Sequence, residues 1–231
     1  MEINNFMIGN IPSVLWGPVS DNLLIAVHGN QSNKTDVVIE IVAGIAVEKG
    51  YRVLSFDLPE HGDRKEESRL CDAQNCAHDL AQIMKYARTL SDEISVFGCS
   101  IGAYFSMLAY QNEPIKRALF LSPIVDMKHL IENMMKWFNV SKEQLEKEQE
   151  VTTPINTLYW HYYQYVLRHP VKWDKPTALL YGAKDELSEY ETVSAFAERC
   201  NANMTVLDDS EHFFHTERQL DFLRNWLHEN I

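Results

Sequence analysis

Short runs of apolar residues alternate along the chain with longer segments in which apolar residues recur every three or four positions. The runs are continuous rather than alternating, which is typical of parallel strands buried on both faces. They lie at 23–27, 52–56, 94–97, 118–122, 177–182 and 204–207. Helical patterns follow most of them, at 37–46, 72–90, 104–110, 189–200 and 217–229. This succession predicts an α/β fold with a mainly parallel central sheet and helices on both faces.

Two segments depart from this rhythm. Residues up to about 18 alternate loosely between apolar and polar positions, which predicts an edge strand or hairpin ahead of the sheet. Within 126–170, helical patterns around 130–138 and 158–167 flank a charged run at 141–150. Neighbouring parallel strands need only a short crossover, so we expect residues 126–170 to be an inserted helical cap or lid over the strand ends. Residues 1–125 and 171–231 are then expected to form the core.

Composition narrows the class of protein. The chain has 231 residues, of which 45% are hydrophobic, enough for one large core. A formal net charge of -12 opposes binding to nucleic-acid phosphates or to anionic membrane surfaces. The first residues lack a basic region followed by an apolar core, and no later run approaches membrane-spanning length. We therefore expect a cytoplasmic protein without nucleic-acid or membrane partners. Its oligomeric state stays open, and a homodimer is one of the alternatives.

A serine flanked by glycines follows the apolar run at 94–97. The motif Gly98–Gly102 stands between that run and a helical pattern, as a nucleophile elbow requires. Such a turn is so sharp that side chains at the two glycine positions would collide with its surroundings. Ser100 at its apex is the candidate nucleophile. The amide of Ile101, at a helix N-terminus, is a candidate donor to an oxyanion.

A serine hydroxyl reacts only when a base takes its proton and an acid holds that base. Asp185 follows the apolar run at 177–182, and His212 follows the last run at 204–207. The carboxyl ends of parallel strands share one edge of a sheet. We therefore expect Ser100, Asp185 and His212 to meet there as a catalytic triad.

Other residues compete for these roles. Asp126 follows the preceding strand and is a rival for the acid, while His215 and His28 are rivals for the base. Cys99 is a rival nucleophile, disfavoured because only the apex side chain of an elbow points at the substrate. The four cysteines lack zinc-ligand spacing, so free thiols are expected.

Together these motifs resemble those of the α/β-hydrolase superfamily, of the small esterase, lipase and serine-aminopeptidase kind with a helical cap. The matching pieces are His28-Gly29, Asp57–Gly62, Gly98–Gly102, Gly182–Asp185 and His212–Phe214. The resemblance implies Ser100, Asp185 and His212 as nucleophile, acid and base, and the backbone amides of Asn30 and Ile101 as the oxyanion hole. The family usually has glycine where Glu60 stands and often serine near Asp63, so this loop departs from its pattern.

The resulting hypothesis is a serine hydrolase of the carboxylesterase kind, which cleaves an ester or related small acyl substrate through an acyl-enzyme. No metal or organic cofactor is implied. A thioesterase, an aminopeptidase or a lyase using the same triad stays open, as does a non-catalytic ligand-binding protein. The aromatic residues within 159–165 either line an acyl pocket or pack against the core. The sequence does not disclose the acyl group, the leaving group or the role of the Glu60–Gly62 loop.

Overall fold

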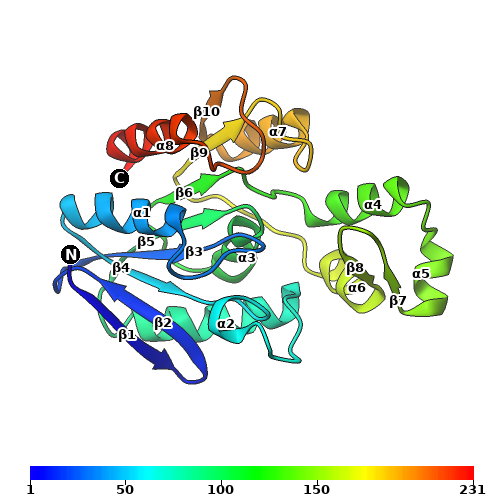
Figure 1. Cartoon of the computed structure of the whole chain (residues 1–231), viewed down its shortest axis with the longest axis horizontal. Helices are drawn as coiled ribbons and strands as arrows, with labels where there is room; N and C mark the ends of the chain where they lie inside the picture. The colour runs from blue at the N-terminus through cyan, green and yellow to red at the C-terminus, as the bar shows by residue number, and fades with distance from the viewer.

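The structure is a computed structural model that describes residues 1–231. Its centre is one sheet, whose strands are β1 (Ile3–Ile8), β2 (Ile11–Trp16), β3 (Asn22–Val27), β4 (Tyr51–Phe56), β5 (Glu93–Cys99), β6 (Ala118–Leu121), β9 (Thr177–Gly182) and β10 (Asn203–Leu207). Their order across the sheet is β1-β2-β4-β3-β5-β6-β9-β10 (Figure 1). The six strands from β4 to β10 in this order pair in parallel, and the predicted N-terminal hairpin β1-β2 adds an antiparallel edge. The predicted mainly parallel sheet is confirmed.

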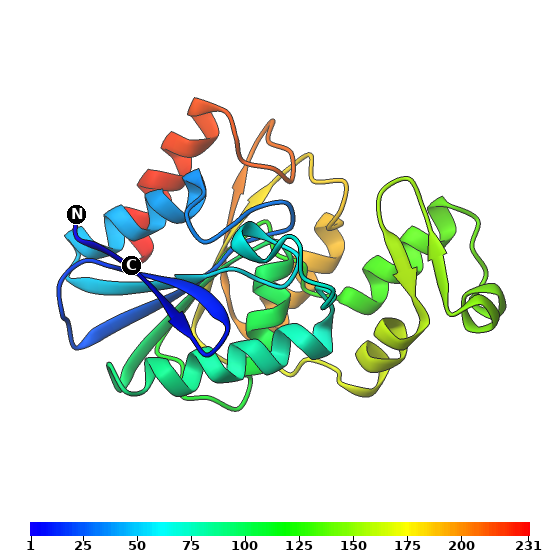
Figure 2. The ribbon, with the colours of Figure 1, turned by 60° about the horizontal axis from the view of Figure 1, so that its bottom comes forward.

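Helices cover both faces of the sheet, as predicted. Helices α1 (Val37–Glu48) and α8 (Glu217–Asn230) bury their apolar residues in one cluster against the sheet. Helices α2 (Ala73–Ala87), α3 (Ile101–Tyr110) and α7 (Tyr190–Cys200) bury theirs in a second cluster on the other face (Figure 2). The α/β architecture therefore follows from the positions of the apolar residues.

Aspartate residues cap the N-termini of two helices. Asp36 caps α1 by accepting a hydrogen bond from the amide of Ile39, at 2.9 Å. Asp72 caps α2 by accepting one from the amide of Asn75, at 2.8 Å. Each carboxylate satisfies an amide that has no acceptor within its own helix. None of the helices combines the length and apolar character needed to cross a bilayer.

Between β6 and β9 the chain leaves the sheet and forms a separate lobe beside it (Figure 1). We call residues 126–170 the inserted segment. Its elements are α4 (Met127–Trp137), α5 (Lys142–Glu148), β7 (Glu150–Thr152), β8 (Thr157–Tyr159) and α6 (Trp160–Arg168). The sequence pattern predicted only the helices now seen as α4 and α6. It missed α5 because that helix buries a single residue, Leu145, and it missed the hairpin β7-β8 because strands of three residues are too short to show a period.

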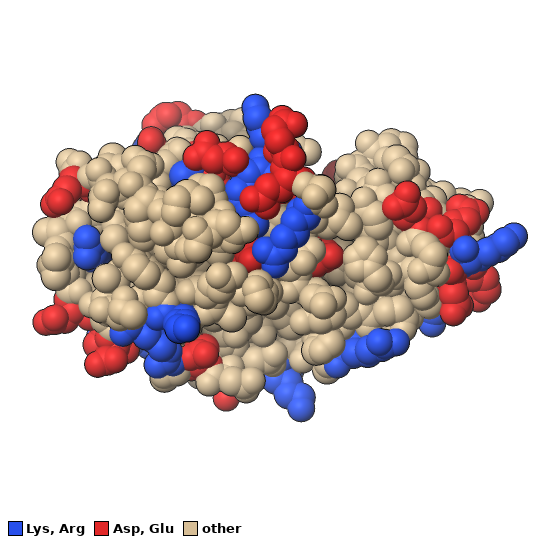
Figure 3. Space-filling model, turned by 90° about the horizontal axis from the view of Figure 1, so that it is seen from below, with Lys and Arg blue, Asp and Glu red and all other residues tan.

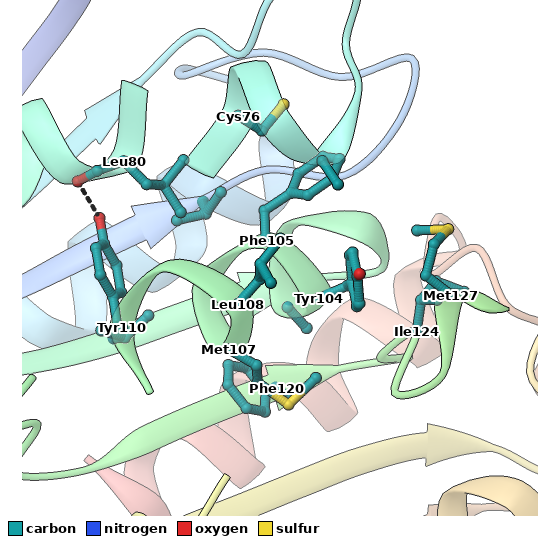
Figure 4. Close-up of a cluster of buried hydrophobic side chains, with 14 of the residues drawn as sticks. Cys76, Leu80, Tyr104, Phe105, Met107, Leu108, Tyr110, Phe120, Ile124 and Met127 are labelled. Carbon is teal, nitrogen blue, oxygen red and sulfur yellow. Dashed lines mark hydrogen bonds between the residues drawn. The ribbon is translucent and has the colours of Figure 1, made fainter. Parts of the chain in front are cut away.

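Helices α2 and α3 pack closely against each other. Figure 4 shows Leu80 and Cys76 of α2 opposite Tyr110, Leu108 and Phe105 of α3. The Tyr110 hydroxyl donates a hydrogen bond to the Leu80 carbonyl at 3.1 Å, so this buried phenol is satisfied. The packing holds α3 in one position on the sheet.

The junction between β5 and α3 accepts only glycine at two positions. A Cβ built on Gly98 would lie 2.7 Å from the Cα of Ala103. A Cβ built on Gly102 would lie 2.4 Å from the carbonyl oxygen of His28 and 2.5 Å from that of Val27. Real Cβ atoms do not approach backbone so closely, and backbone cannot rotate away as a side chain does. Gly98 therefore lets α3 begin close against the end of β5, and Gly102 lets it pack directly on the end of β3.

Replacing Gly102 by alanine should destabilise the protein. We expect Gly102→Ala to lower the free energy of unfolding by roughly 3 kcal/mol, because β3 and α3 must separate to admit the methyl group. Gly44→Ala is the matched control, since Gly44 lies inside α1 with no atom within 4 Å of the added Cβ. The control should raise the free energy of unfolding by roughly 0.5–1 kcal/mol. Urea unfolding curves measure both, and equal changes in the two variants would contradict this account.

Candidate active site

Ser100 stands at the turn between β5 and α3 in a strained backbone conformation. Its φ of 52° and ψ of -119° lie where residues other than glycine rarely occur. The amide of Ser100 donates to the carbonyl of Leu121 at 2.9 Å, which holds the turn against β6. The Ser100 Oγ atom lies 2.7 Å from Nε2 of His212. The turn thus aims the hydroxyl at an imidazole 112 residues away in the chain.

His212 is oriented by Asp185. The Oδ2 atom of Asp185 accepts a hydrogen bond from Nδ1 of His212 at 2.6 Å, and its Oδ1 atom accepts bonds from the amides of Leu187 and Ser188, both at 2.9 Å. An ionised carboxylate only accepts, so the imidazole proton resides on Nδ1. Nε2 is then free to accept the proton of the Ser100 hydroxyl. The structure brings the three expected residues together in this order.

The loop that carries His212 approaches the end of β9 very closely. A Cβ on Gly182 would lie 2.5 Å from the carbonyl oxygens of both Ser210 and Glu211. Ala183 and Lys184 continue the contact by donating their amides to the carbonyls of Leu207 and Ser210, at 3.0 Å and 2.8 Å. This contact places the Asp185 and His212 loops side by side.

The rival residues lie elsewhere. Asp126 caps α4 by accepting the amide of His129, and His215 stacks on Phe213 and binds its carbonyl. Cys99 is partly buried against the apolar cluster that α1 and α8 share, and burial raises the pKa of its thiol to about 12. None of the three forms a hydrogen bond with the Ser100 hydroxyl or the His212 ring, whose partners are each other and Asp185.

His28 supports the loop after β3. Its Nδ1 atom donates to the carbonyl of Gly29 at 2.7 Å, and its Nε2 atom accepts from the amide of Leu58 at 3.0 Å. Burial is the main reason that the pKa of His28 falls to about 4, so the ring is neutral at pH 7. His28 therefore joins the loops after β3 and β4 and is not available as a base.

Two backbone amides next to Ser100 lack acceptors. Ile101 is the first residue of α3, so its amide has no partner within the helix. Asn30 follows Gly29, and a Cβ added to Gly29 would lie only 3.2 Å from the Cβ of Ser100. The Asn30 amide donates no hydrogen bond to any backbone or side-chain acceptor of the chain. Both expected oxyanion donors are thus unpaired amides on the two segments that meet at Ser100.

A buried ion pair anchors the Asn30 loop. The Lys34 Nζ atom lies 2.6 Å from Oδ2 of Asp57 and 2.6 Å from Oδ2 of Asp63, while the Lys34 amide donates to Oδ1 of Asp57 at 2.9 Å. Burial by itself lowers the pKa of Lys34, but the two carboxylates outweigh it and raise that pKa. The loop after β4 therefore has a structural role, in holding the loop after β3.

The departure at Glu60 has a structural consequence. Glu60 has a φ of 63°, in the left-handed region that favours glycine. Its carboxylate accepts a hydrogen bond from the amide of Cys71 at 2.6 Å. The next residue, His61, lies against Asn30, with its Nε2 atom 3.0 Å from the side-chain oxygen. Sequence reasoning missed this chain of contacts, although glutamate at a position usually held by glycine was its one visible signal.

The inserted segment touches the loop of Asp185. Oε2 of Glu189 lies 3.1 Å from Nε2 of His129, and Oε1 accepts from the side-chain amide of Asn133 at 3.0 Å. Both partners belong to α4, about 60 residues away along the chain, so no local pattern indicated the contact. Between the sheet and the inserted segment the molecular surface is indented (Figure 3).

The aromatic residues of α6 pack against the core, which is one of the two roles expected of the aromatic residues within 159–165. The rings of Trp160 and Tyr163 pack together with centroids 5.9 Å apart, and the Tyr163 hydroxyl donates to Glu132 at 2.8 Å. These two residues hold the inserted segment together. Tyr162 instead lies near Tyr104 of α3, whose buried hydroxyl has no hydrogen-bond partner. Tyr162 also packs against the main cluster of buried apolar residues, so the acyl-pocket role stays a prediction.

No family model matches the chain, and none of the curated proteins matches it. Solved structures do. Est1E from Butyrivibrio proteoclasticus, solved with ferulic acid bound, superposes with a TM-score of 0.78 at 20% identity over 98% of this chain and 96% of that one. Mouse alpha/beta hydrolase domain-containing protein 10 superposes with a TM-score of 0.78 at 14% identity, over 99% of this chain and 98% of that one.

A third similar structure is an esterase from Pyrococcus furiosus, with a TM-score of 0.70 at 21% identity over 99% of this chain and 89% of that one. A serine hydrolase from Xanthomonas campestris described as lacking a lid is also similar, with a TM-score of 0.69 at 16% identity, over 99% and 93%. Likeness at such low identity reports on architecture. The strand order, the turn at Ser100 and these superpositions together establish that the chain has the α/β-hydrolase fold.

Proposed function

We propose that this chain is a serine hydrolase that cleaves a carboxylic ester or related acyl compound through an acyl-enzyme. The observation that carries the proposal is the continuous hydrogen-bonded series from Ser100 through His212 to Asp185, with links of 2.7 Å and 2.6 Å. A hydroxyl, an imidazole and a buried carboxylate in this order supply a nucleophile, its base and the group that orients the base.

In the first half-reaction the Ser100 oxygen attacks the substrate carbonyl carbon while Nε2 of His212 takes the hydroxyl proton. Asp185 stabilises the imidazolium that forms. The carbonyl oxygen becomes an oxyanion, to which the unpaired amides of Ile101 and Asn30 are available as donors. As the tetrahedral intermediate collapses, His212 gives the proton to the departing alcohol, and the acyl group remains on Ser100.

The second half-reaction uses the same groups with water in place of the alcohol. Nε2 of His212 takes a proton from water, and the resulting hydroxide attacks the acyl carbon. The collapse of the second intermediate returns the proton to the Ser100 oxygen and releases the carboxylic acid. We assign the inserted segment, residues 126–170, the part of a cap that restricts which acyl groups reach Ser100.

The names of similar structures support hydrolysis broadly. An esterase and a protein solved with ferulic acid stand among them, as does a thioesterase domain from the curacin biosynthetic pathway, with a TM-score of 0.64 at 17% identity over 98% of this chain and 99% of that one. Esters, thioesters and aminoacyl amides all place a carbonyl carbon before a leaving group. A panel of the three, each compared with Ser100→Ala, separates esterase, thioesterase and aminopeptidase activity.

Removal of the Ser100 hydroxyl should abolish activity. We expect the protein to hydrolyse short p-nitrophenyl esters and Ser100→Ala to reduce kcat by on the order of 10³-fold or more, because no other nucleophile occupies the elbow. A fluorophosphonate should label one residue per chain, Ser100, as read by peptide mass spectrometry. Folded protein that neither hydrolyses these esters nor takes the label, or Ser100→Ala with unchanged kcat, would show that the proposed function is wrong.

The two candidate acids can be separated with one conservative change each. We expect Asp185→Asn to lower kcat by on the order of 10³–10⁴-fold, because an amide facing Nδ1 of His212 favours the tautomer with the proton on Nε2. Asp126→Asn is the matched control. Asparagine caps a helix as well as aspartate does, so kcat should stay within about twofold. The reverse ranking of the two variants would assign the acid to Asp126.

A further inference from the structure

Two cysteines that the proposed hydrolysis does not use lie together at the N-terminus of α2. The Sγ atoms of Cys71 and Cys76 are 3.6 Å apart. Cys71 is half-buried in the segment just before Asp72. Cys76 is fully buried in the first turns of the helix, and Figure 4 shows it on α2, opposite α3. The pair therefore joins a half-buried cysteine to a fully buried one, with their sulfur atoms next to each other.

The two thiols differ in acidity. A hydrogen bond from the Cys76 thiol outweighs the effect of burial and, with His61 beside it, lowers the pKa of Cys71 from 9.0 to about 7. Burial and the neighbouring Cys71 sulfur raise the pKa of Cys76 well above its ordinary value. At neutral pH a large part of Cys71 is thus thiolate, which is the nucleophilic form, while Cys76 keeps its proton.

His61 is a base beside Cys71 whose pKa is raised from its ordinary value. Its Nδ1 atom lies 2.7 Å from the carbonyl oxygen of Pro59, and its Nε2 atom lies 3.0 Å from the side-chain oxygen of Asn30. The Pro59 carbonyl only accepts, so Nδ1 of His61 carries a proton, and Nε2 pairs with the side-chain amide of Asn30. Burial alone lowers the pKa of His61, but the Cys71 sulfur and the Pro59 carbonyl raise it above 6.5. A positive ring beside Cys71 favours the thiolate.

The remaining groups around the pair are acidic or phenolic. Glu60 opposes ionisation of Cys71, and Asp72 and Asp79 oppose that of Cys76. Tyr162 of the inserted segment lies close to both sulfurs and stays protonated, because burial raises its pKa well above 10. Among the ionisable side chains other than Cys76 around the pair, His61 is the one that lowers the pKa of Cys71.

The other two cysteines provide a contrast within the same chain. Burial raises the pKa of Cys99 to about 12 and also raises that of Cys200. The Cys200 thiol donates to the carbonyl of Trp173 at 3.1 Å and has no sulfur beside it. Both are unreactive thiols at neutral pH.

We propose that Cys71 and Cys76 are an oxidation site, at which a small peroxide converts the two thiols to an intramolecular disulfide. The Cys71 thiolate attacks one peroxide oxygen, the S–O bond forms as the O–O bond breaks, and the departing hydroxide takes a proton to become water. Cys76 then attacks the sulfenic sulfur of Cys71. The S–S bond forms as the S–O bond breaks, and hydroxide leaves with the Cys76 proton as a second water.

The geometry requires little movement. A disulfide needs its sulfurs roughly 2.05 Å apart, so the two must approach by about 1.5 Å from their separation of 3.6 Å. Cys76 is fixed within α2, but Cys71 precedes the helix. Side-chain rotation and a small shift of the Cys71 segment can therefore close the gap.

The test uses the whole folded protein. Reduced protein is treated with near-stoichiometric hydrogen peroxide, its free thiols are alkylated after unfolding, and its peptides are mapped without reduction. We expect a crosslink between Cys71 and Cys76, a mass loss of two hydrogens, and alkylated Cys99 and Cys200. With Cys76→Ser, dimedone should trap the sulfenic acid on Cys71. Four alkylated thiols, oxidation of Cys99 or Cys200 as fast as Cys71, or a disulfide between two chains would overturn the proposal.

The role of His61 has its own readout. The rate of Cys71 alkylation by iodoacetamide should rise with pH through a midpoint near 7, because only the thiolate reacts and its pKa is about 7. In His61→Gln the midpoint should move upward, since glutamine can still donate to Asn30 but carries no charge. An unchanged midpoint in this variant would show that His61 does not ionise Cys71. Neither measurement depends on hydrolytic activity.

Oxidation of the two cysteines should also shift the Asn30 loop and so disturb the proposed oxyanion hole. This expectation rests on the proposed function. Glu60 holds the Cys71 amide, and the adjacent His61 holds the Asn30 side chain, so a shift of Cys71 is passed to the Asn30 loop. We expect kcat/KM for an ester to fall several-fold on oxidation and to recover with dithiothreitol, with no such response in Cys71→Ser. A crosslinked protein with unchanged kcat/KM would contradict this coupling, whereas a protein inactive in both states would leave the crosslink standing and refute the proposed function.

Discussion

The contact between the first turn of α3 and the end of β3 determines where every group of the candidate site can lie. Gly102 places its backbone against the carbonyls of Val27 and His28, at distances that no side chain permits. The same contact brings Gly29 so close to Ser100 that a Cβ on Gly29 would lie 3.2 Å from the Ser100 Cβ. Two backbone segments with unpaired amides thus converge on one hydroxyl. The positions of the reacting groups are therefore set by backbone packing before the identity of the side chains matters.

A second close backbone contact brings the base His212 and the acid Asp185 together. Strands β9 and β10 pair in parallel, with Leu207 opposite Gly182, so the loops that follow them leave the sheet side by side. The Ser210 and Glu211 carbonyls lie where a side chain at position 182 would stand. Asp185 and His212 are consequently close without being close in sequence. The site is built from the four loops that follow β3, β5, β9 and β10 at one edge of the sheet.

Much of this arrangement follows from the sequence because its signals are local. Continuous apolar runs identify the parallel strands, and the glycines around Ser100 identify the turn at which a side chain cannot fit. Asp185 and His212 can be selected because each follows a strand whose carboxyl end lies at the same edge. The rivals Asp126 and His215 also lie in segments that follow strands. Only the hydrogen bonds of the structure distinguish them from Asp185 and His212.

The parts that sequence reasoning missed lack a local signal. Helix α5 buries only Leu145, so it shows no apolar face. The contact of Glu189 with α4 joins residues about 60 positions apart, and the contact of His61 with Asn30 depends on two loops from different strands. The Cys71–Cys76 pair is five residues apart and becomes visible only when the loop before α2 is folded. Long-range loop contacts of this kind require the whole sheet.

The measurement that tests the account most directly is the mass of the protein during turnover. The protein is mixed with a p-nitrophenyl ester of a slowly released acyl group and quenched in acid before the first turnover is complete. The account predicts one acyl group per chain, found on the peptide that contains Ser100, in amounts equal to the p-nitrophenol released in the burst. Release of p-nitrophenol with no acylated peptide, or with the acyl group on another residue, would contradict it.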